Sequence, residues 1–194
     1  MKAVAGVFKS GDEARRLAQK VCALGVPEDH VAVLVPKENN NHWRHRLRVL
    51  EAEGLPEDES FICEDALRGG RSVLIALAEA EGTAGKIRNL MAQEGVESIA
   101  SARERWWVGL REGEKEHYAA SGRDFRRDER FYRLGFEAAV HSRTRGKEYD
   151  QVLSELARDL DELEKRYPAP EIEEPFRRGY ERGTAYFESI RRQE

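Results

Sequence analysis

AVAGVFKSGDEARRLAQKVCALGVPEDHVAVLVP, residues 3–36, contains two short apolar runs separated by an amphipathic segment. The runs Ala3–Phe8 and Val31–Val35 have the length and the continuous apolar character of buried strands. Between them, Ser10 has a glutamate three residues later, which is the spacing of a capping box and predicts a helix start. Gly25 predicts the end of that helix. The order strand, helix, strand is that of a crossover unit.

The same order recurs further along the chain. Ser72–Ala78 predicts a third strand, Thr83–Glu94 a helix with Thr83 as its N-cap, and Val96–Ala102 an alternating edge strand. Two such halves make a ferredoxin-like four-stranded sheet with helices on one face. We therefore expect an α+β fold whose first domain spans residues 1–102.

A polar and then amphipathic insert separates the two halves, at about residues 38–68. Glu38–Gly54 predicts one helix, with tryptophan and leucine on one face. A second helix is predicted over about Pro56–Leu67, before Gly69 and Gly70. The first domain is therefore expected to carry a helical insert.

The rest of the chain, residues 103–194, has no strand pattern and is predicted to be a helical module. A linker helix over Arg103–Ala120 leads into three helices, at about residues 126–141, 149–167 and 174–191. The sequence YRLGFE at 132–137 is echoed by FRRGYE at 176–181, and each copy places two aromatic residues around a glycine. Because glycine lets another element approach closely, we expect two like helices that pack against the middle one.

These patterns resemble the YflT-type heat-induced (general) stress protein domain. Residues 3–36 are similar to its first half, and GLPEDESFICEDALRGGRSVLIALAEAEGTAGKIRNLMAQEGVESI, residues 54–99, to its second half. The tail resembles a helical module often seen beside such domains, through ERFYRLGFEAA, TRGKEYDQV, EKRYP and EEPFRRGYERG. The resemblance implies stress association and no established reaction.

One segment departs from that family. Many members carry an apolar Gly/Ala-rich hairpin between the two halves, whereas residues 37–53 of this chain, KENNNHWRHRLRVLEAE, are polar. A membrane-associated role that the hairpin would suggest is therefore not expected for this chain.

Composition excludes several classes of protein. Of the 194 residues, 40% are hydrophobic, which is enough to bury a core. The net charge of −4 argues against a general nucleic-acid binder. No apolar run is long enough to cross a membrane, and the first residues lack a secretory h-region. Because two cysteines, Cys22 and Cys63, do not make a disulfide framework, a cytoplasmic protein is expected.

Two helix starts are candidate contacts for a small ligand. The sequence GTAGK at residues 82–86 lacks the spacing of a P-loop, but a helix N-terminus attracts anions. In a ligand-sensing protein the candidate contacts are Ser10, Gly11, Thr83, Gly85 and Lys86. The alternative is that Thr83 is an ordinary N-cap.

A short basic and aromatic segment precedes residue 50. It consists of Trp43, Arg44, Arg46 and Arg48, a composition typical of single-stranded RNA contacts. Acidic residues follow at once, and no wider basic surface accompanies the segment, so nucleic-acid binding is a weak alternative. His42 and His45 share a helix face, but zinc needs three or four ligands, so no metal and no cofactor are predicted.

Aromatic residues concentrate after residue 100. They form either a core or a subunit interface, where Trp, Tyr and Arg are enriched. The candidate interface residues are Trp106, Trp107, Phe131, Tyr132, Phe136, Phe176 and Tyr180.

No catalytic motif is found, and no catalytic residue is predicted. We therefore expect a soluble, non-enzymatic, stress-associated protein that self-associates, as a homo-oligomer, or binds another macromolecule such as a protein partner. Its expected surfaces are the open face or the edge of the sheet and the aromatic helices. A small-ligand sensor and a weak RNA-binding protein are the alternatives.

Overall fold

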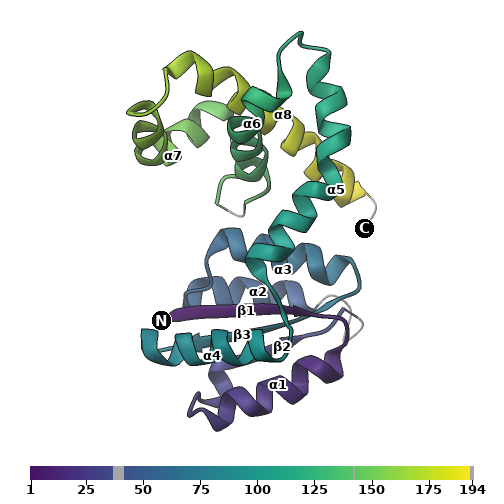
Figure 1. Ribbon diagram of the computed structural model, residues 1–194, viewed down its shortest axis with the longest axis vertical. Coiled ribbons are helices and arrows are strands. Elements are labelled where there is room, and N and C mark those ends of the chain that lie inside the picture. Colours follow the sequence, from purple (N-terminus) through teal and green to yellow (C-terminus); the bar gives the residue numbers. More distant parts are fainter. Residues whose placement is uncertain (37–41, 142, 193–194) are drawn as a thin grey trace. The chain divides into compact units, whose positions relative to one another are not determined.

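The structure is a computed structural model that describes residues 1–36, 42–141 and 143–192 (Figure 1). The chain divides into two compact units, Met1–Gly109 and Leu110–Glu194. The first contains a sheet and helices, and the second contains helices joined by turns, with no strand among the described residues. The fold is therefore α+β.

Four antiparallel strands form the sheet in the order β2-β3-β1-β4. They are β1 (Lys2–Phe8), β2 (Val31–Leu34), β3 (Ser72–Ala78) and β4 (Glu97–Ser98). Strand β1 pairs with β3 along its whole length, from Lys2 opposite Ala78 to Phe8 opposite Ser72. The first three strands were predicted within two residues of their observed ends.

Strand β4 is much shorter than predicted. The alternation in residues 96–102 suggested an edge strand, but only two residues, Glu97 and Ser98, pair with β1. From Ile99 the chain forms a long helix, α5 (Ile99–Ala119). The Ser98 hydroxyl accepts a hydrogen bond from the Ser101 amide at 3.2 Å, so it caps the first turn of this helix. The predicted edge strand over Val96–Ala102 is therefore confirmed only at Glu97 and Ser98, and its second half is helix.

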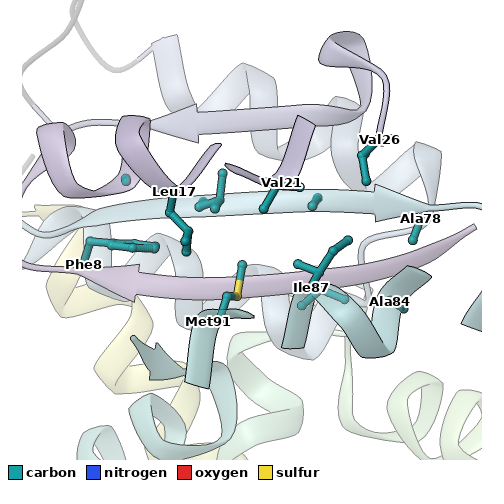
Figure 2. Close-up of a cluster of buried hydrophobic side chains, with 12 residues drawn as sticks. Phe8, Leu17, Val21, Val26, Ala78, Ala84, Ile87 and Met91 are labelled. Carbon is teal, nitrogen blue, oxygen red and sulfur yellow. The ribbon is translucent and has the colours of Figure 1, made fainter. Parts of the chain in front are cut away.

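Helices α1 (Gly11–Ala23) and α4 (Glu81–Gln93) cover one face of the sheet, where they enclose a continuous apolar cluster (Figure 2). Helix α1 begins as predicted, because the Ser10 hydroxyl accepts from the Glu13 amide at 3.3 Å. Helix α4 begins two residues earlier than predicted. Its N-cap is Ala80, which makes no side-chain cap, so Thr83 is not the N-cap.

Helices α2 (His42–Glu53) and α3 (Glu57–Arg68) lie on the opposite side of the sheet from α1 and α4 (Figure 1). All seven residues of β3 are buried, and successive side chains of a strand point to opposite faces. Both faces are therefore covered, and the prediction of helices on one face only is wrong. The predicted start of the first insert helix, at residues 38–41, lies outside the described residues.

The second unit contains the end of α5 and helices α6 (Phe125–Val140), α7 (Tyr149–Glu164) and α8 (Ala169–Arg192). Helix α8 begins five residues before the predicted start. Pro170 falls in its first turn, where the missing amide proton would have had no helical partner, and the helix continues through Pro175.

The two echoed segments pack directly on one another. An added Cβ on Gly135 of α6 would overlap the carbonyl oxygen of Phe176 and lie 2.9 Å from the Tyr180 nitrogen. A Cβ on Gly179 of α8 would overlap the Tyr132 carbonyl oxygen in the same way. The glycines thus allow a reciprocal backbone contact between α6 and α8. The prediction that both copies pack mainly against the helix between them is wrong, because the glycines bring the copies themselves together.

Candidate functional site

One edge of β1 has no strand neighbour over half of its length. On this side β4 pairs only with Gly6 and Val7. Along Lys2–Ala5 no other strand of the described residues takes its place. In an antiparallel strand, backbone N–H and C=O groups point alternately toward the two edges. Part of the Lys2–Ala5 backbone therefore presents unpaired donors and acceptors at this edge, a feature that templates pairing with another chain.

A groove of about 280 Å³ follows this edge. Its base is formed by Ala3–Ala5, and one wall by Met91 and Ala92 of α4. The start of α5, including Ile99, also lines it. We call this groove the β1 edge groove. Its lining is mostly small and apolar, so a narrow extended segment fits it better than a bulky surface does.

The wall of the groove opposite α4, which includes Glu59 of α3 and Ile99 of α5, is held in place by contacts between these two helices. The ring of Phe61 lies edge-on to Trp106, with 5.1 Å between the ring centroids. Arg103 and Asp58 form an ion pair between the same two helices. These contacts hold the chain in the helix after Ser98 and so explain why β4 does not continue along β1.

The Glu59 side chain lines the β1 edge groove, and its carboxylate has no hydrogen-bond partner among the described residues. Burial and the nearby carboxylate of Asp58 raise the pKa of Glu59, against the attraction of Arg103 and Arg88. Arg88, on the groove wall, forms an ion pair with Glu81. Glu59 is thus a half-buried carboxylate that can accept a hydrogen bond from a bound segment. Sequence reasoning missed it, because one glutamate among many on a charged helix gives no signal.

The five candidate ligand contacts are divided between two ends of the sheet. Ser10 and Gly11 follow the end of β1, whereas Thr83, Gly85 and Lys86 follow the end of β3. Because β1 and β3 are antiparallel, these ends are six residue steps apart, about 20 Å at ~3.4 Å per residue. The fold does not bring the two groups together.

A larger groove, of about 470 Å³, lies beside the start of α1 and the end of α4. It is lined by charges of both signs. Lys20 pairs with Glu94, and Arg71 pairs with Glu97. These ion pairs compensate most of the charge of the lining. The groove therefore favours neither anionic nor cationic ligands.

The basic and aromatic segment lies on α2. Trp43 is buried, and the Arg44 guanidinium lies 5.1 Å from its ring centroid. The Trp43 ring is thus covered by the protein rather than presented to a base. Arg46 and Arg48, the other two candidate contacts, are half-buried and exposed, respectively.

Among the described residues the metal-ligand candidates form a pair of histidines and no larger cluster. His42 and His45 stand side by side, with 6.1 Å between their ring centroids. In the part of the chain that the structure describes, no group of three His, Cys, Asp or Glu side chains is placed to hold a metal ion. Cys63 is fully buried, and burial raises its thiol pKa, which makes it unreactive.

All seven candidate interface residues are buried in the single chain. Trp106 and Trp107 belong to the first unit; Phe131, Tyr132, Phe136, Phe176 and Tyr180 belong to the second. Their burial fits the core alternative. An interface role stays a prediction that would require these side chains to become accessible.

Two buried carboxylates in the second unit are each held by a tyrosine and arginine. Glu114 accepts hydrogen bonds from Tyr132 (2.6 Å) and from Arg182 (2.8 and 3.0 Å). Asp128 accepts hydrogen bonds from Tyr118 (2.7 Å), Arg123 (2.8 Å) and Arg127 (2.9 Å).

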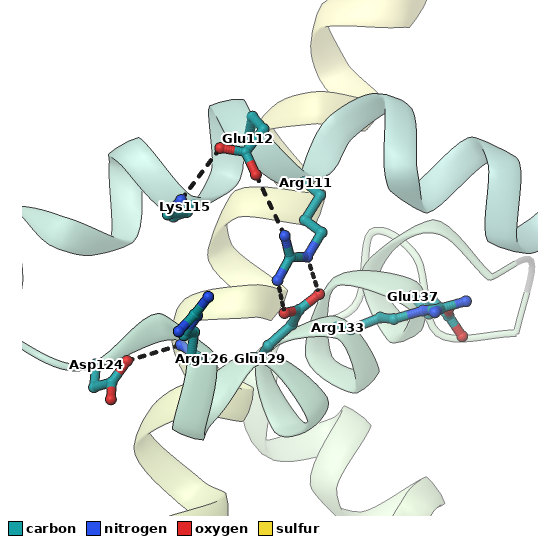
Figure 3. Close-up of polar contacts among 8 residues, drawn as sticks. All are labelled: Arg111, Glu112, Lys115, Asp124, Arg126, Glu129, Arg133 and Glu137. Atoms are coloured by element: carbon teal, nitrogen blue, oxygen red, sulfur yellow. Dashed lines mark hydrogen bonds and ion pairs between the residues drawn. The ribbon is translucent and has the colours of Figure 1, made fainter.

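A third carboxylate of this unit, Glu129 of α6, binds Arg111 of α5 through two bonds of 2.6 and 2.7 Å (Figure 3). With their charges compensated, these groups tie helices of the second unit together.

The pH dependence of stability follows from the Asp128 cluster. Burial alone would raise the pKa of Asp128, but the hydrogen bonds from Arg127, Arg123 and Tyr118 outweigh it and hold the pKa below its usual 3.8. Burial and the bond to Asp128 raise the pKa of Tyr118 from 10.0 to about 12. The Asp128 contribution to stability is therefore complete above pH 3.8 and is lost as the pH falls below it. The Tyr118 contribution is complete below pH 10.0 and is lost between pH 10.0 and about 12.

Denaturant unfolding of the protein at a series of pH values measures both losses. The variant Asp128→Asn is expected to flatten the acid limb, and Tyr118→Phe to reduce the alkaline limb. Unchanged limbs in both variants would show that this cluster does not set the pH dependence.

No described helix has both the length and the apolar character to cross a membrane. Comparison of the chain with protein-family models, with curated proteins and with solved structures found no match. The function is therefore argued from the geometry of the chain itself.

Proposed function

We propose that this protein acts without catalysis, by binding an extended segment of another polypeptide along Lys2–Ala5 of β1. The observation that carries the proposal is the unpaired edge of β1 at the base of an apolar groove. An added strand would satisfy the backbone groups at this edge, which is the recognition mode known as β-strand addition. The two faces of the sheet offer no such surface, because helices cover both of them.

The ferredoxin-like assignment of residues 1–102 belongs to the same proposal. Its support is the strand order: β3 lies between β1 and β2, and β1 lies between β3 and β4. Two interleaved strand–helix–strand halves produce this arrangement. The resemblance to heat-induced stress protein domains adds the proposal that binding occurs during stress, when unfolded segments are abundant.

The chemistry of the β1 edge groove defines the segment it binds. Backbone pairing gives affinity, and side chains at alternate positions enter the walls. Ala3, Ala5 and Ala92 leave room for small or β-branched side chains. Glu59 favours a hydroxyl or a basic side chain on the side of α3. We therefore expect segments that alternate valine or threonine with polar residues.

A synthetic hexapeptide that alternates threonine and valine tests the proposal. Amide hydrogen exchange of the full chain is followed by NMR with and without the peptide. In the free protein, alternate amides among residues 2–5 are expected to exchange rapidly, because only every second one faces β3. With bound peptide, the exchange of these amides is expected to slow by about tenfold. The same peptide N-methylated at each backbone amide should give no protection, because it cannot donate to the edge.

Matched variants locate the binding. Ala92→Trp fills the β1 edge groove from an exposed position of α4 and should abolish the protection. Ala52→Trp, at an exposed position of α2 outside the groove, should retain it. The proposal would be overturned by protection that survives Ala92→Trp. It would also be overturned if the unchanged chain showed no protection at millimolar peptide. A dimer in native mass spectrometry that Ala92→Trp dissociates would assign the edge to a second copy instead, in line with self-association.

A further inference from the structure

A third groove, of about 310 Å³, lies between α7 and α8 in the second unit. Its floor is apolar and comes from both helices: Leu153, Ala157 and Leu160 of α7, and Ile172 and Phe176 of α8. We call it the α7–α8 groove. It is remote in sequence from β1 and does not depend on the function proposed for the sheet edge.

Helix α7 packs only part of its apolar stripe against the rest of the unit. Val152 is its buried residue, whereas the four leucines along the helix, at 153, 156, 160 and 163, are half-buried. An amphipathic helix of a compact unit normally covers such a stripe. The remaining apolar surface of α7 is thus available at the α7–α8 groove.

The rim of the α7–α8 groove is acidic. Asp161 and Glu164 of α7 and Glu173 of α8 line it, and none of their carboxylates forms a hydrogen bond or ion pair with a described residue. Arg177 also lines the groove, but its guanidinium lies over the Tyr149 ring, 4.9 Å from the ring centroid. The groove therefore combines an apolar floor with three carboxylates and one guanidinium, so its lining carries net negative charge.

The sequence that contains α7 also carries net negative charge. The sequence from Glu148 to Arg166 contains seven acidic residues and three basic ones. Opposite charge along a groove steers a cationic partner and disfavours an anionic one. Residues at i, i+3, i+4 and i+7 of a docking helix would fill the floor.

We propose that the α7–α8 groove binds a cationic amphipathic helix of a partner protein. The leucine-rich face of that helix would lie on Leu153 and Leu160, the half-buried leucines of the groove lining. Its lysines or arginines would pair with Asp161, Glu164 and Glu173. Both an apolar face and positive charge are needed, because the floor and the rim recognise different properties of the same helix.

Three synthetic peptides of about fourteen residues test the proposal by fluorescence anisotropy with the full chain. The first places leucine at the helical spacing of one face and lysine elsewhere. In the second, glutamate replaces lysine; in the third, the order is scrambled, so that charge is kept and the apolar face is lost. The first peptide is expected to bind at least about tenfold more tightly than either of the others, the factor that corresponds to ~1.4 kcal/mol.

A pair of matched charge reversals on α7 assigns the site. Asp161→Lys/Glu164→Lys should weaken binding of the lysine peptide at least about tenfold. Asp159→Lys/Glu162→Lys makes the same change of net charge outside the groove lining and should weaken it less than about threefold, through long-range attraction only. Both reversals place positive charge near the end of a helix, where it is tolerated, and circular dichroism verifies folding.

Equal weakening by both variants would overturn the proposal, since binding would then depend on net charge alone. Equal affinity for the scrambled peptide would overturn it as well. A complex of two copies of this chain that Asp161→Lys/Glu164→Lys disrupts would also contradict it, because the occupant would be a second copy.

Discussion

Replacing Gly179 with alanine is expected to destabilise the second unit strongly. The added methyl group would overlap the Tyr132 carbonyl oxygen and lie 3.0 Å from the Phe136 nitrogen, so the backbones of α6 and α8 would have to separate. Overpacking of this kind costs ~3 kcal/mol or more, which exceeds the ~1 kcal/mol that alanine gains over glycine in a helix. Thermal unfolding followed by tyrosine near-UV circular dichroism measures the loss.

A matched glycine-to-alanine change separates packing from helix propensity. Gly113 lies inside α5 with no atom near the position of an added Cβ. Gly113→Ala is therefore expected to stabilise the unit by ~0.5–1 kcal/mol. A Gly179→Ala protein that melts at the temperature of the unchanged chain would show that α6 and α8 are not in backbone contact at this glycine.

Removal of the Arg182 guanidinium is expected to have the next largest effect. The Glu114 side chain is only 5% exposed, and Arg182 supplies two of its hydrogen bonds. In Arg182→Met the carboxylate would remain buried, with the Tyr132 hydroxyl as a hydrogen-bond donor. Loss of one partner of a buried pair costs about 3 kcal/mol. The midpoint of denaturant unfolding should fall accordingly.

Two further variants test the cause of that loss. Adding Glu114→Gln to Arg182→Met removes the uncompensated charge and should restore part of the stability, because an amide is cheaper to bury than a carboxylate. Lys115→Met breaks an exposed pair with Glu112 and should cost less than about 1 kcal/mol. If the Arg182 and Lys115 variants were destabilised equally, burial of Glu114 would not be the source of the effect.

The sequence of β3 indicates that both faces of the sheet are covered, although the prediction placed helices on one face. SVLIALA, at Ser72–Ala78, is a continuous apolar run, and a strand without alternation is buried on both faces. The run was correctly identified as a strand. Its lack of alternation also required helices on both sides, and the insert supplies the second layer.

The β1 edge groove had no comparable signal. Val96–Ala102 alternates as an edge strand does, yet the chain turns into α5 at Ile99. Alternation over a few residues is a weak local preference, whereas Trp106 packing on Phe61 is a contact between distant parts of the chain. The tertiary contact prevails, and it leaves Lys2–Ala5 paired with β3 on one edge and without a strand neighbour among the described residues on the other.

The α6–α8 contact lies between these cases. The echo of YRLGFE and FRRGYE identified the glycines that permit close approach, but not which helix approaches them. Periodicity and capping residues act within a few residues, so the chain alone set the elements and most of their limits. The choice of neighbours, and with it the free strand edge and the acidic groove, follows from long-range packing, in which the apolar surfaces of all elements compete for one another.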